Sequence, residues 1–217
     1  MGTSRVVVFA GGDCRDLNFY RRLIGPRDRI VCADGGSRHV LAMGLSPFAV
    51  VGDLDSVDRA LEEKLKQLPL EWIRNPSLDQ EQSDLEMALV YALSLEPAEL
   101  LICGALGGDR VDHLLANLHL LLIPLQAGVE ARIVDEGQTI GLLDREMIIS
   151  GRPGDYLSLL SLTLKTTGIT TQGLKYPLHG GTLNFGSTRG LSNELISPSA
   201  RVAASSGLLL VVHTTRR

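Results

Sequence analysis

The sequence has few cysteines and no long apolar run. No stretch approaches the roughly 18 apolar residues that a transmembrane helix needs, and the first apolar run is too short for a secretory signal. The three cysteines are odd in number and widely spaced, which fits neither a disulfide framework nor a zinc site. We therefore expect a cytoplasmic protein with reduced thiols and no membrane partner.

Basic residues are outnumbered by acidic ones. The chain carries 21 Lys and Arg against 25 Asp and Glu, a net charge of −4, which argues against non-specific binding to nucleic acid or to an anionic membrane. Lysine is especially scarce, with four copies against 17 arginines. A phosphate-binding side chain is therefore expected to be arginine, whose planar fork binds phosphate through two donors.

Three familiar motifs are also missing. The chain has no GxxxxGK[ST] loop, no GxGxxG after a predicted strand and no GxSxG turn. Their absence excludes a P-loop enzyme, and leaves a dinucleotide-binding fold and a serine hydrolase unsupported.

The first 135 residues alternate short apolar runs with helical patterns. Apolar runs such as 5–10, 30–33 and 100–103 predict buried strands, and the segments between them predict helices. The helical pattern at 111–125 is unusually apolar, so we expect that helix to be well buried. Continuous apolar strands separated by helices are typical of a parallel sheet covered on both faces. We predict an open, mostly parallel α/β (Rossmann-like) domain over residues 1–138.

The pattern changes near residue 135. Beyond residue 139 no convincing helix follows, and short β-rich runs at 147–150, 156–162, 168–171 and 208–213 are separated by Gly, Pro, Asn and Ser. This is typical of a small antiparallel sandwich or barrel. We predict a C-terminal antiparallel β-sandwich domain over residues 139–217.

Aspartates gather at the ends of the predicted strands. Eight of the 14 Asp lie between residues 34 and 112, and several stand beside glycine in the segments 34–36, 52–56 and 104–113. Ligands bind beyond the carboxyl ends of strands in open parallel sheets, and glycine lets the backbone approach a phosphate closely. Because carboxylates alone repel phosphate, we expect Mg²⁺ between them at a nucleotide site.

Several of these residues also have plain structural interpretations. Ser83 and Glu86 form a capping box, and an acid at Asp84 suits a helix start. The 34–36 segment can be a simple turn, His113 can hydrogen-bond within its loop, and 192–193 can be turn residues.

Six segments in order resemble one enzyme family. They are ADGG (33–36), GDLDS (52–56), DQEQSD (79–84), GALGGDRVDHLLAN (104–117), GLKYPL (173–178) and the Ser192-Asn193 pair. Together they resemble the signature of thiamine pyrophosphokinase. One segment departs from the pattern, since the family's GGRxDH reads here as GGDRVDH: either Asp109 is extra or the loop is locally remodelled.

The resemblance implies a fold, an activity and a set of site residues. It implies an α/β catalytic domain, a thiamine-binding β-sandwich domain and a homodimer with the active site at the subunit interface. The implied reaction transfers the pyrophosphoryl group of ATP to the hydroxyl of thiamine, giving thiamine diphosphate and AMP, with Mg²⁺ as cofactor. The implied catalytic residues are Asp53, Asp55, Asp84, Arg110 and Asp112.

The same resemblance assigns roles to individual residues. Asp53, Asp55 and Asp84 would hold Mg²⁺, Arg110 and Asp112 would lie near the phosphates, and Asp34 would line the nucleotide end of the cleft. Gln80 would help to hold thiamine, and Ser192 and Asn193 would reach it from the partner subunit. The remaining candidates for ligand binding are Gly35, Gly36, Ser83, Gly107, Gly108, His113 and Asn117.

Two other functions stay open at this stage. One is a pyrophosphokinase for another hydroxymethyl heterocycle, such as a pterin. The other is a noncatalytic protein that binds a nucleotide or thiamine. The segment around Gln80 and the whole C-terminal part favour thiamine, and the full set of acidic residues favours an enzyme.

Overall fold

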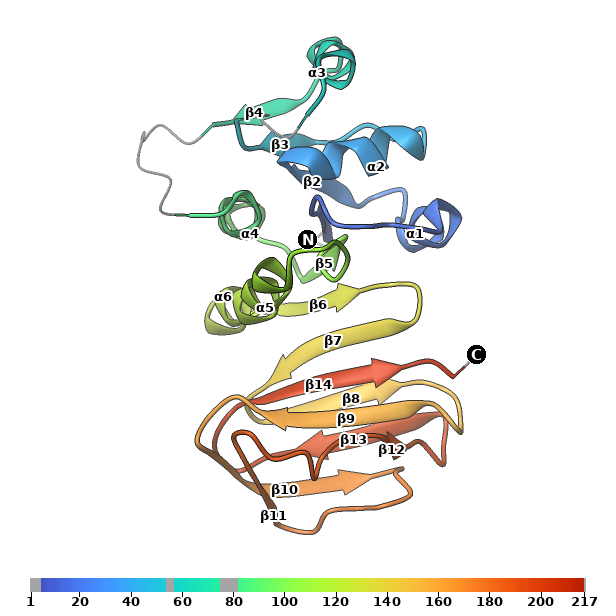
Figure 1. Ribbon diagram of the computed structural model, residues 1–217, viewed down its shortest axis with the longest axis vertical. Coiled ribbons are helices and arrows are strands. Elements are labelled where there is room, and N and C mark those ends of the chain that lie inside the picture. The colour runs from blue at the N-terminus through green and yellow to red at the C-terminus, as the bar shows by residue number, and fades with distance from the viewer. Residues whose placement is uncertain (1–4, 54–56, 75–81, 217) are drawn as a thin grey trace. The chain divides into compact units, whose positions relative to one another are not determined.

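The chain forms two compact units, Met1–Glu136 and Gly137–Arg217. The computed structural model describes residues 5–53, 57–74 and 82–216 (Figure 1). The first unit is an α/β sheet structure and the second an antiparallel β-sandwich, which confirms the predicted fold class. No helix in the described ranges is long and apolar enough to cross a membrane.

Six parallel strands build the sheet of the first unit. In the order in which they pair, they are β6 (Glu130–Val134), β5 (Glu99–Cys103), β1 (Val6–Phe9), β2 (Arg29–Ala33), β3 (Ala49–Val51) and β4 (Glu71–Ile73). At the centre, Val8 stands between Val31 of β2 and Ile102 of β5. All the carboxyl ends therefore point to the same edge of the sheet.

Short helices connect these strands. They are α1 (Leu17–Leu23), the 3₁₀ turn η1 (Asp34–Gly36), α2 (Ser37–Ala42), α3 (Arg59–Lys66), α4 (Asp84–Ser94), α5 (Val111–Leu120) and α6 (Leu122–Gln126). The side chains of Asp16, Asp58 and Ser83 accept backbone N–H groups at the starts of α1, α3 and α4. Such caps satisfy donors that a helix start would leave without partners.

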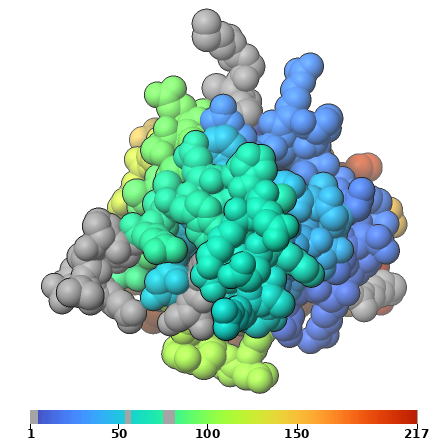
Figure 2. All heavy atoms as spheres, turned by 90° about the horizontal axis from the view of Figure 1, so that it is seen from above, coloured from blue at the N-terminus to red at the C-terminus, as the bar shows by residue number. Residues whose placement is uncertain are grey.

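The sheet is covered on both faces. Val7 and Phe9 of β1 pack in one cluster with Tyr20 of α1, Val40 of α2 and Leu65 of α3. Alternation along the strand sends the neighbouring side chains to the opposite face, where α4 packs against β1, β2 and β3. Each fully buried large side chain contributes about 1.5–3 kcal/mol to folding. The exposed charged face of α3 lies at the front of Figure 2, in teal.

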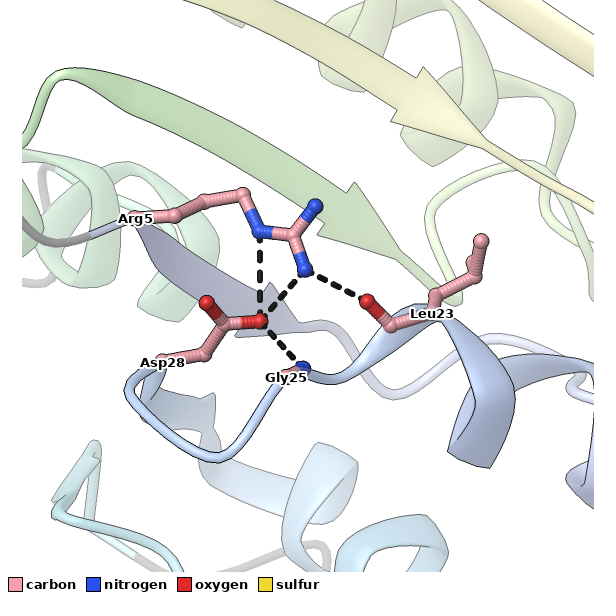
Figure 3. Close-up of polar contacts among 4 residues, drawn as sticks. All are labelled: Arg5, Leu23, Gly25 and Asp28. Atoms are coloured by element: carbon pink, nitrogen blue, oxygen red, sulfur yellow. Dashed lines mark hydrogen bonds and ion pairs between the residues drawn. The ribbon is translucent and has the colours of Figure 1, made fainter.

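A polar cluster ties the start of β1 to the turn before β2. Arg5 donates through Nε (3.2 Å) and Nη2 (2.5 Å) to Oδ2 of Asp28, and through Nη2 to the carbonyl of Leu23 (2.5 Å) (Figure 3). The same Asp28 oxygen accepts the N–H of Gly25 (2.7 Å). The cluster lies at the amino end of β1, away from the carboxyl ends where ligands bind, so its role is structural.

The prediction of a single, well-buried helix over residues 111–125 is wrong in two respects. The chain forms two helices, α5 and α6, which meet at Leu121. Pro124 has no N–H to bond to the carbonyl four residues earlier, which explains the break. Helix α5 has no buried residue, and Val111 and Leu115 are 69% and 51% exposed. Apolar composition predicted burial, but the described part of the chain does not cover this face.

The second unit contains two antiparallel sheets and no helix within its described residues. One sheet pairs β12 (Asn193–Glu194), β9 (Tyr156–Ser161), β14 (Leu209–Thr214) and β7 (Gln138–Leu143) in that order. The other pairs β11 (Gly181–Asn184), β10 (Lys165–Gln172), β13 (Ser199–Ala203) and β8 (Glu146–Ser150). Leu157, Leu159 and Leu209 from the first sheet pack against Ile169 and Val202 from the second.

A buried carboxylate with three hydrogen-bond partners lies at one end of this sandwich. His213 of β14 contacts Oδ2 of Asp155 through Nε2 (3.0 Å), and Asp155 also accepts the N–H groups of Arg152 (2.8 Å) and Arg216 (3.0 Å). Burial raises the pKa of Asp155, but these three hydrogen bonds outweigh it and hold the pKa below its ordinary value.

Candidate active site

A cavity of about 290 Å³ opens at the carboxyl ends of β1, β2 and β5. It lies where ligands bind in open parallel sheets. Many of the predicted site residues line it: Asp34, Gly35, Ser83, Asp84, Gly107, Gly108, Arg110, His113 and Asn117. The extra Asp109 and the glycines at 11, 12 and 104 also line it.

Asp34 begins the turn after β2 in a strained conformation. Its φ is +38°, in the left-handed region that residues other than glycine rarely adopt. The residue is 3% exposed, and its Oδ1 has no hydrogen-bond partner among the described residues. A buried, unpartnered carboxylate oxygen costs free energy, so its presence in a cavity indicates a ligand-binding role.

A second carboxylate, that of Asp84, lies near Asp34, and Gly52 leaves space for both side chains. A Cβ at Gly52 would lie 2.9 Å from Oδ1 of Asp84 and 3.0 Å from Cβ of Asp34. The φ of Gly52 is +132°, which L side chains rarely adopt. The glycine at the end of β3 therefore makes room for the acidic side chains that arrive from β2 and from the start of α4.

The predicted metal trio is only partly described. Asp53 follows Gly52 directly, Asp84 lines the cavity, and Asp55 lies outside the described residues. Within the described ranges, no group of three or more His, Cys, Asp or Glu is arranged to hold an ion. The unpartnered oxygen of Asp34, with Asp84 beside it, nevertheless fits a hard cation, because Mg²⁺ prefers carboxylate oxygens.

Ser83 has the capping role that its sequence context predicts. Its Oγ accepts the N–H of Glu86 (3.3 Å), while the carboxylate of Glu86 accepts the side-chain amide of Gln82 (3.0 Å). Glu86 is thus directed to Gln82 and not back to Ser83, and only half of the capping box forms. Helix α4 still begins with Asp84 on the cavity wall.

Arg110 and Asp112 form an ion pair at the start of α5. Arg110 donates through Nη2 to Oδ2 of Asp112 (2.6 Å) and through Nε to Oδ1 (2.9 Å). The hydrogen bond from Arg110 lowers the pKa of Asp112 to about 2. Arg110 lines the cavity, whereas Asp112 is not among its lining residues.

The loop between β5 and α5 is held by close backbone contacts. Asn117 donates through Nδ2 to the carbonyl of Ala105 (2.9 Å). A Cβ at Gly107 would lie 2.6 Å from the backbone N of Asp13, whereas a Cβ at Gly108 would meet nothing within 4 Å. Gly107 therefore allows two loops to touch, and Asn117 has a structural contact as well as its place on the cavity wall.

Gly36 has a packing role. It is not among the residues that line the cavity, and a Cβ there would lie 2.0 Å from the carbonyl oxygen of Phe9. No side chain fits between η1 and the end of β1. The glycine is thus explained by its closeness to the neighbouring backbone.

Ser192 and Asn193 lie in the second unit, at the start of β12. Ser192 has a φ of +57° and its N–H donates to Oγ of Ser158 (3.0 Å). Asn193 accepts the N–H of Tyr176 through Oδ1 (3.0 Å) and donates to the Tyr176 carbonyl through Nδ2 (2.7 Å). The two C-terminal motif segments are thereby joined to each other. Gln80 lies outside the described residues.

Arg38 is a cavity residue that the sequence reasoning missed. It is the second residue of α2, lines the cavity, and donates through Nη2 to the carbonyl of Gly11. Beside it, His39 contacts the carbonyl of Gly12 through Nε2 (2.7 Å), and burial lowers the pKa of this imidazole. The position of Arg38 just after the Asp34–Gly36 turn was the available signal.

Comparisons with known proteins agree with this geometry. Residues 20–133 match the family model described as "Thiamin pyrophosphokinase, catalytic domain", and residues 145–209 match "Thiamin pyrophosphokinase, vitamin B1 binding domain". The chain is 30% identical over 188 residues to thiamine pyrophosphokinase from Bacillus subtilis, covering 84% of this chain and 85% of that protein.

Solved structures give the same result. The crystal structure of thiamine pyrophosphokinase from Bacillus subtilis superposes with a TM-score of 0.87 at 27% identity, covering 99% of this chain and 100% of that one. The one from Geobacillus thermodenitrificans gives 0.84 at 27% identity, covering 98% of each chain. The chain belongs to the thiamine pyrophosphokinase family.

Proposed function

We propose that this protein transfers the pyrophosphoryl group of ATP to the hydroxyl of thiamine, giving thiamine diphosphate and AMP. The main observation behind the proposal is that the side chains of Asp34 and Asp84 both lie next to Gly52. They line a cavity that glycine-rich loops also line. Membership of the family supplies the identity of the substrates. The cavity supplies the acidic and glycine-rich environment that a metal-bound polyphosphate requires.

Each part of the chain has its own role in this proposal. Residues 1–138 form the domain that binds ATP and Mg²⁺, and residues 139–217 form the domain that binds thiamine and makes the dimer. The matches of two separate family models, to residues 20–133 and to residues 145–209, support the division. We further place the protein in the cytoplasm, where its three free cysteines would stay reduced.

Asp53, Asp55 and Asp84 are the proposed Mg²⁺ ligands. The unpartnered oxygen of Asp34 supports a cation at this position, because a bound cation would satisfy it. When bound, Mg²⁺ neutralises charge on the phosphates and orients them. The glycines at 35, 107 and 108 let the protein backbone approach the phosphates of ATP, while Arg110, His113 and Asn117 face the same space.

The reaction is a substitution at the β-phosphorus of ATP. A bond forms between the thiamine hydroxyl oxygen and the β-phosphorus, and the bond between the β-phosphorus and the oxygen that bridges it to the α-phosphorus breaks. AMP leaves with that oxygen, and the proton of the hydroxyl passes to solvent. The protein mainly positions the two substrates and stabilises charge. Gln80 is proposed to hold thiamine, and Asp112 to keep the guanidinium of Arg110 near the phosphates.

Ser192 and Asn193 are proposed to contact thiamine from the partner subunit of a homodimer. Val111 and Leu115, four residues apart on the same face of α5, are both exposed, and they support self-association because exposed apolar side chains on one face are typical of an interface. Sedimentation equilibrium of the whole chain at micromolar concentration tests the dimer. A mass equal to one chain at all concentrations would contradict it.

The activity itself is tested by mixing the protein with ATP, Mg²⁺ and thiamine and measuring AMP and thiamine diphosphate. We expect both products in equal amounts, and none when thiamine is left out. A hydroxymethylpterin in place of thiamine is the matched control. AMP formed with the pterin but not with thiamine would reassign the substrate, and tight thiamine binding without AMP would indicate a noncatalytic protein.

A further inference from the structure

Two arginines line the cavity within the described residues, and they differ in what they bind. Arg110 is paired through two of its nitrogens with the carboxylate of Asp112. Arg38 reaches the cavity from α2 and donates through Nη2 to the backbone carbonyl of Gly11. One guanidinium therefore already has an anionic partner, and the other is held by a neutral group.

A second donor of Arg38, its Nε, has no acceptor in the neighbouring His39. Nε of Arg38 lies 3.4 Å from Nε2 of His39, while the same Nε2 lies 2.7 Å from the carbonyl oxygen of Gly12. A carbonyl oxygen only accepts, so Nε2 of His39 carries the proton and donates to Gly12. It then has no lone pair for Arg38, and Nε of Arg38 remains available to a ligand.

Arg38 also lacks a carboxylate partner within the described part of the chain. No ion pair of Arg38 with a described Asp or Glu is present, although Asp34 and Asp84 line the same cavity. A guanidinium that faces a solvent-open cavity and rests on one carbonyl exchanges that bond readily for a phosphate. The charge-assisted, two-donor contact with phosphate is stronger than a neutral hydrogen bond.

We propose that Arg38 is a phosphate-binding residue for the nucleotide co-substrate, and that its guanidinium moves from the carbonyl of Gly11 to the polyphosphate when the nucleotide binds. The inference rests on the proposed function, because it takes the cavity as the ATP site. It assigns a phosphate contact to a residue of α2, whereas sequence reasoning gave that role to Arg110 alone. Arg38 and Arg110 would then hold the polyphosphate from two different loops.

The test compares Arg38→Gln with Arg22→Gln, which removes an exposed arginine of α1 outside the cavity. Isothermal titration calorimetry measures binding of α,β-methylene ATP with Mg²⁺, and of adenosine, which has no phosphate. Arg38→Gln should weaken binding of the ATP analogue by about 10- to 100-fold and leave adenosine binding unchanged. Arg22→Gln should bind both like the wild type, and Arg38→Lys should recover part of the loss.

The other outcomes separate a wrong role for Arg38 from a wrong proposed function. If Arg38→Gln binds the ATP analogue as tightly as Arg22→Gln while the wild type forms AMP, the role of Arg38 is wrong and the proposed function stands. An equal loss of analogue and adenosine binding would also overturn it, because the phosphates would not be involved. If the wild type neither binds the analogue nor forms AMP, the proposed function fails, and the role of Arg38 with it.

Discussion

Gly52 and Asp84 are fitted to each other: a Cβ on this glycine would lie 2.9 Å from Oδ1 of the aspartate, in a backbone conformation with φ of +132°. Gly52→Ala therefore forces the carboxylate of Asp84 to move and strains the end of β3. We expect AMP formation to fall by at least about 100-fold and the free energy of unfolding to drop by about 2–4 kcal/mol. Urea unfolding and a steady-state assay measure the two effects.

Gly128→Ala is the matched control for Gly52→Ala. Gly128 also has a positive φ, +73°, but a Cβ there would meet nothing within 4 Å. It should cost about 1–2 kcal/mol of stability through backbone strain alone and leave turnover unchanged. Full activity in Gly52→Ala would show that the position of Asp84 is not critical.

We expect the carboxylate of Asp34 to be needed for activity and not for the stability of the fold. Its Oδ1 is buried without a partner, so Asp34→Asn removes a carboxylate that the folded protein does not satisfy. Asn adopts the left-handed conformation at least as readily as Asp, so the substitution adds no backbone strain. We expect AMP formation to fall by about 100-fold or more, while the free energy of unfolding without ligands stays equal or rises by up to about 1 kcal/mol.

Asp58→Asn is a suitable comparison for Asp34→Asn. Asp58 caps α3 by accepting the N–H of Leu61 (2.8 Å), and Asn caps helices as well as Asp does. This variant should keep both activity and stability. A large loss of stability in Asp34→Asn would instead assign Asp34 a structural role.

Much of this fold could be predicted because local patterns agree with the tertiary structure. The apolar run 5–10 becomes the central strand β1, and the Ser83 signal marks the start of α4. Strands β7, β11, β12 and β13 were missed: β7 is interrupted by Gly141, and the other three are short or carry alternating small and polar residues. Their pairing depends on long-range contacts that no local pattern encodes.

The site could be predicted in outline and not in its contacts. Asp34, Asp84 and Arg110 share one cavity because the carboxyl ends of parallel strands meet at one edge. The sequence did not predict the pairing of Arg110 with Asp112, and it did not predict that Arg38 lines the cavity. Both depend on side-chain directions at the first turns of α2 and α5, which residue spacing does not specify.

The ion pair between Arg110 and Asp112 should be visible in a titration. The hydrogen bond from Arg110 lowers the pKa of Asp112 to about 2. Because the folded state binds this proton less tightly, the stabilisation is present above the ordinary pKa near 3.8 and is lost as pH falls through about 2. Carboxyl ¹³C shifts from NMR should show the low midpoint in the wild type and a return toward 3.8 in Arg110→Gln. A titration of Asp112 unaffected by this substitution would mean that the pair does not persist in solution.

Asp155 should be the most stability-sensitive carboxylate of the sandwich. It is 3% exposed and accepts from His213 and from the N–H groups of Arg152 and Arg216. Asp155→Asn places an NH₂ group among these donors, so we expect a loss of about 2–4 kcal/mol at pH 7, measured by urea unfolding. Asp144→Asn, at an exposed position, should change stability by less than about 0.5 kcal/mol.

The pH dependence of Asp155→Asn provides a second measurement on the same residue. The hydrogen bonds outweigh burial and hold the pKa of Asp155 below its ordinary value, so its contribution is present at neutral pH. It is lost on acidification, as pH falls below the ordinary Asp value of 3.8 and through the lower folded pKa. Unfolding curves between pH 2 and 7 should therefore converge for wild type and variant at the acid end. A constant gap across that range would show that packing, and not the carboxylate, accounts for the loss.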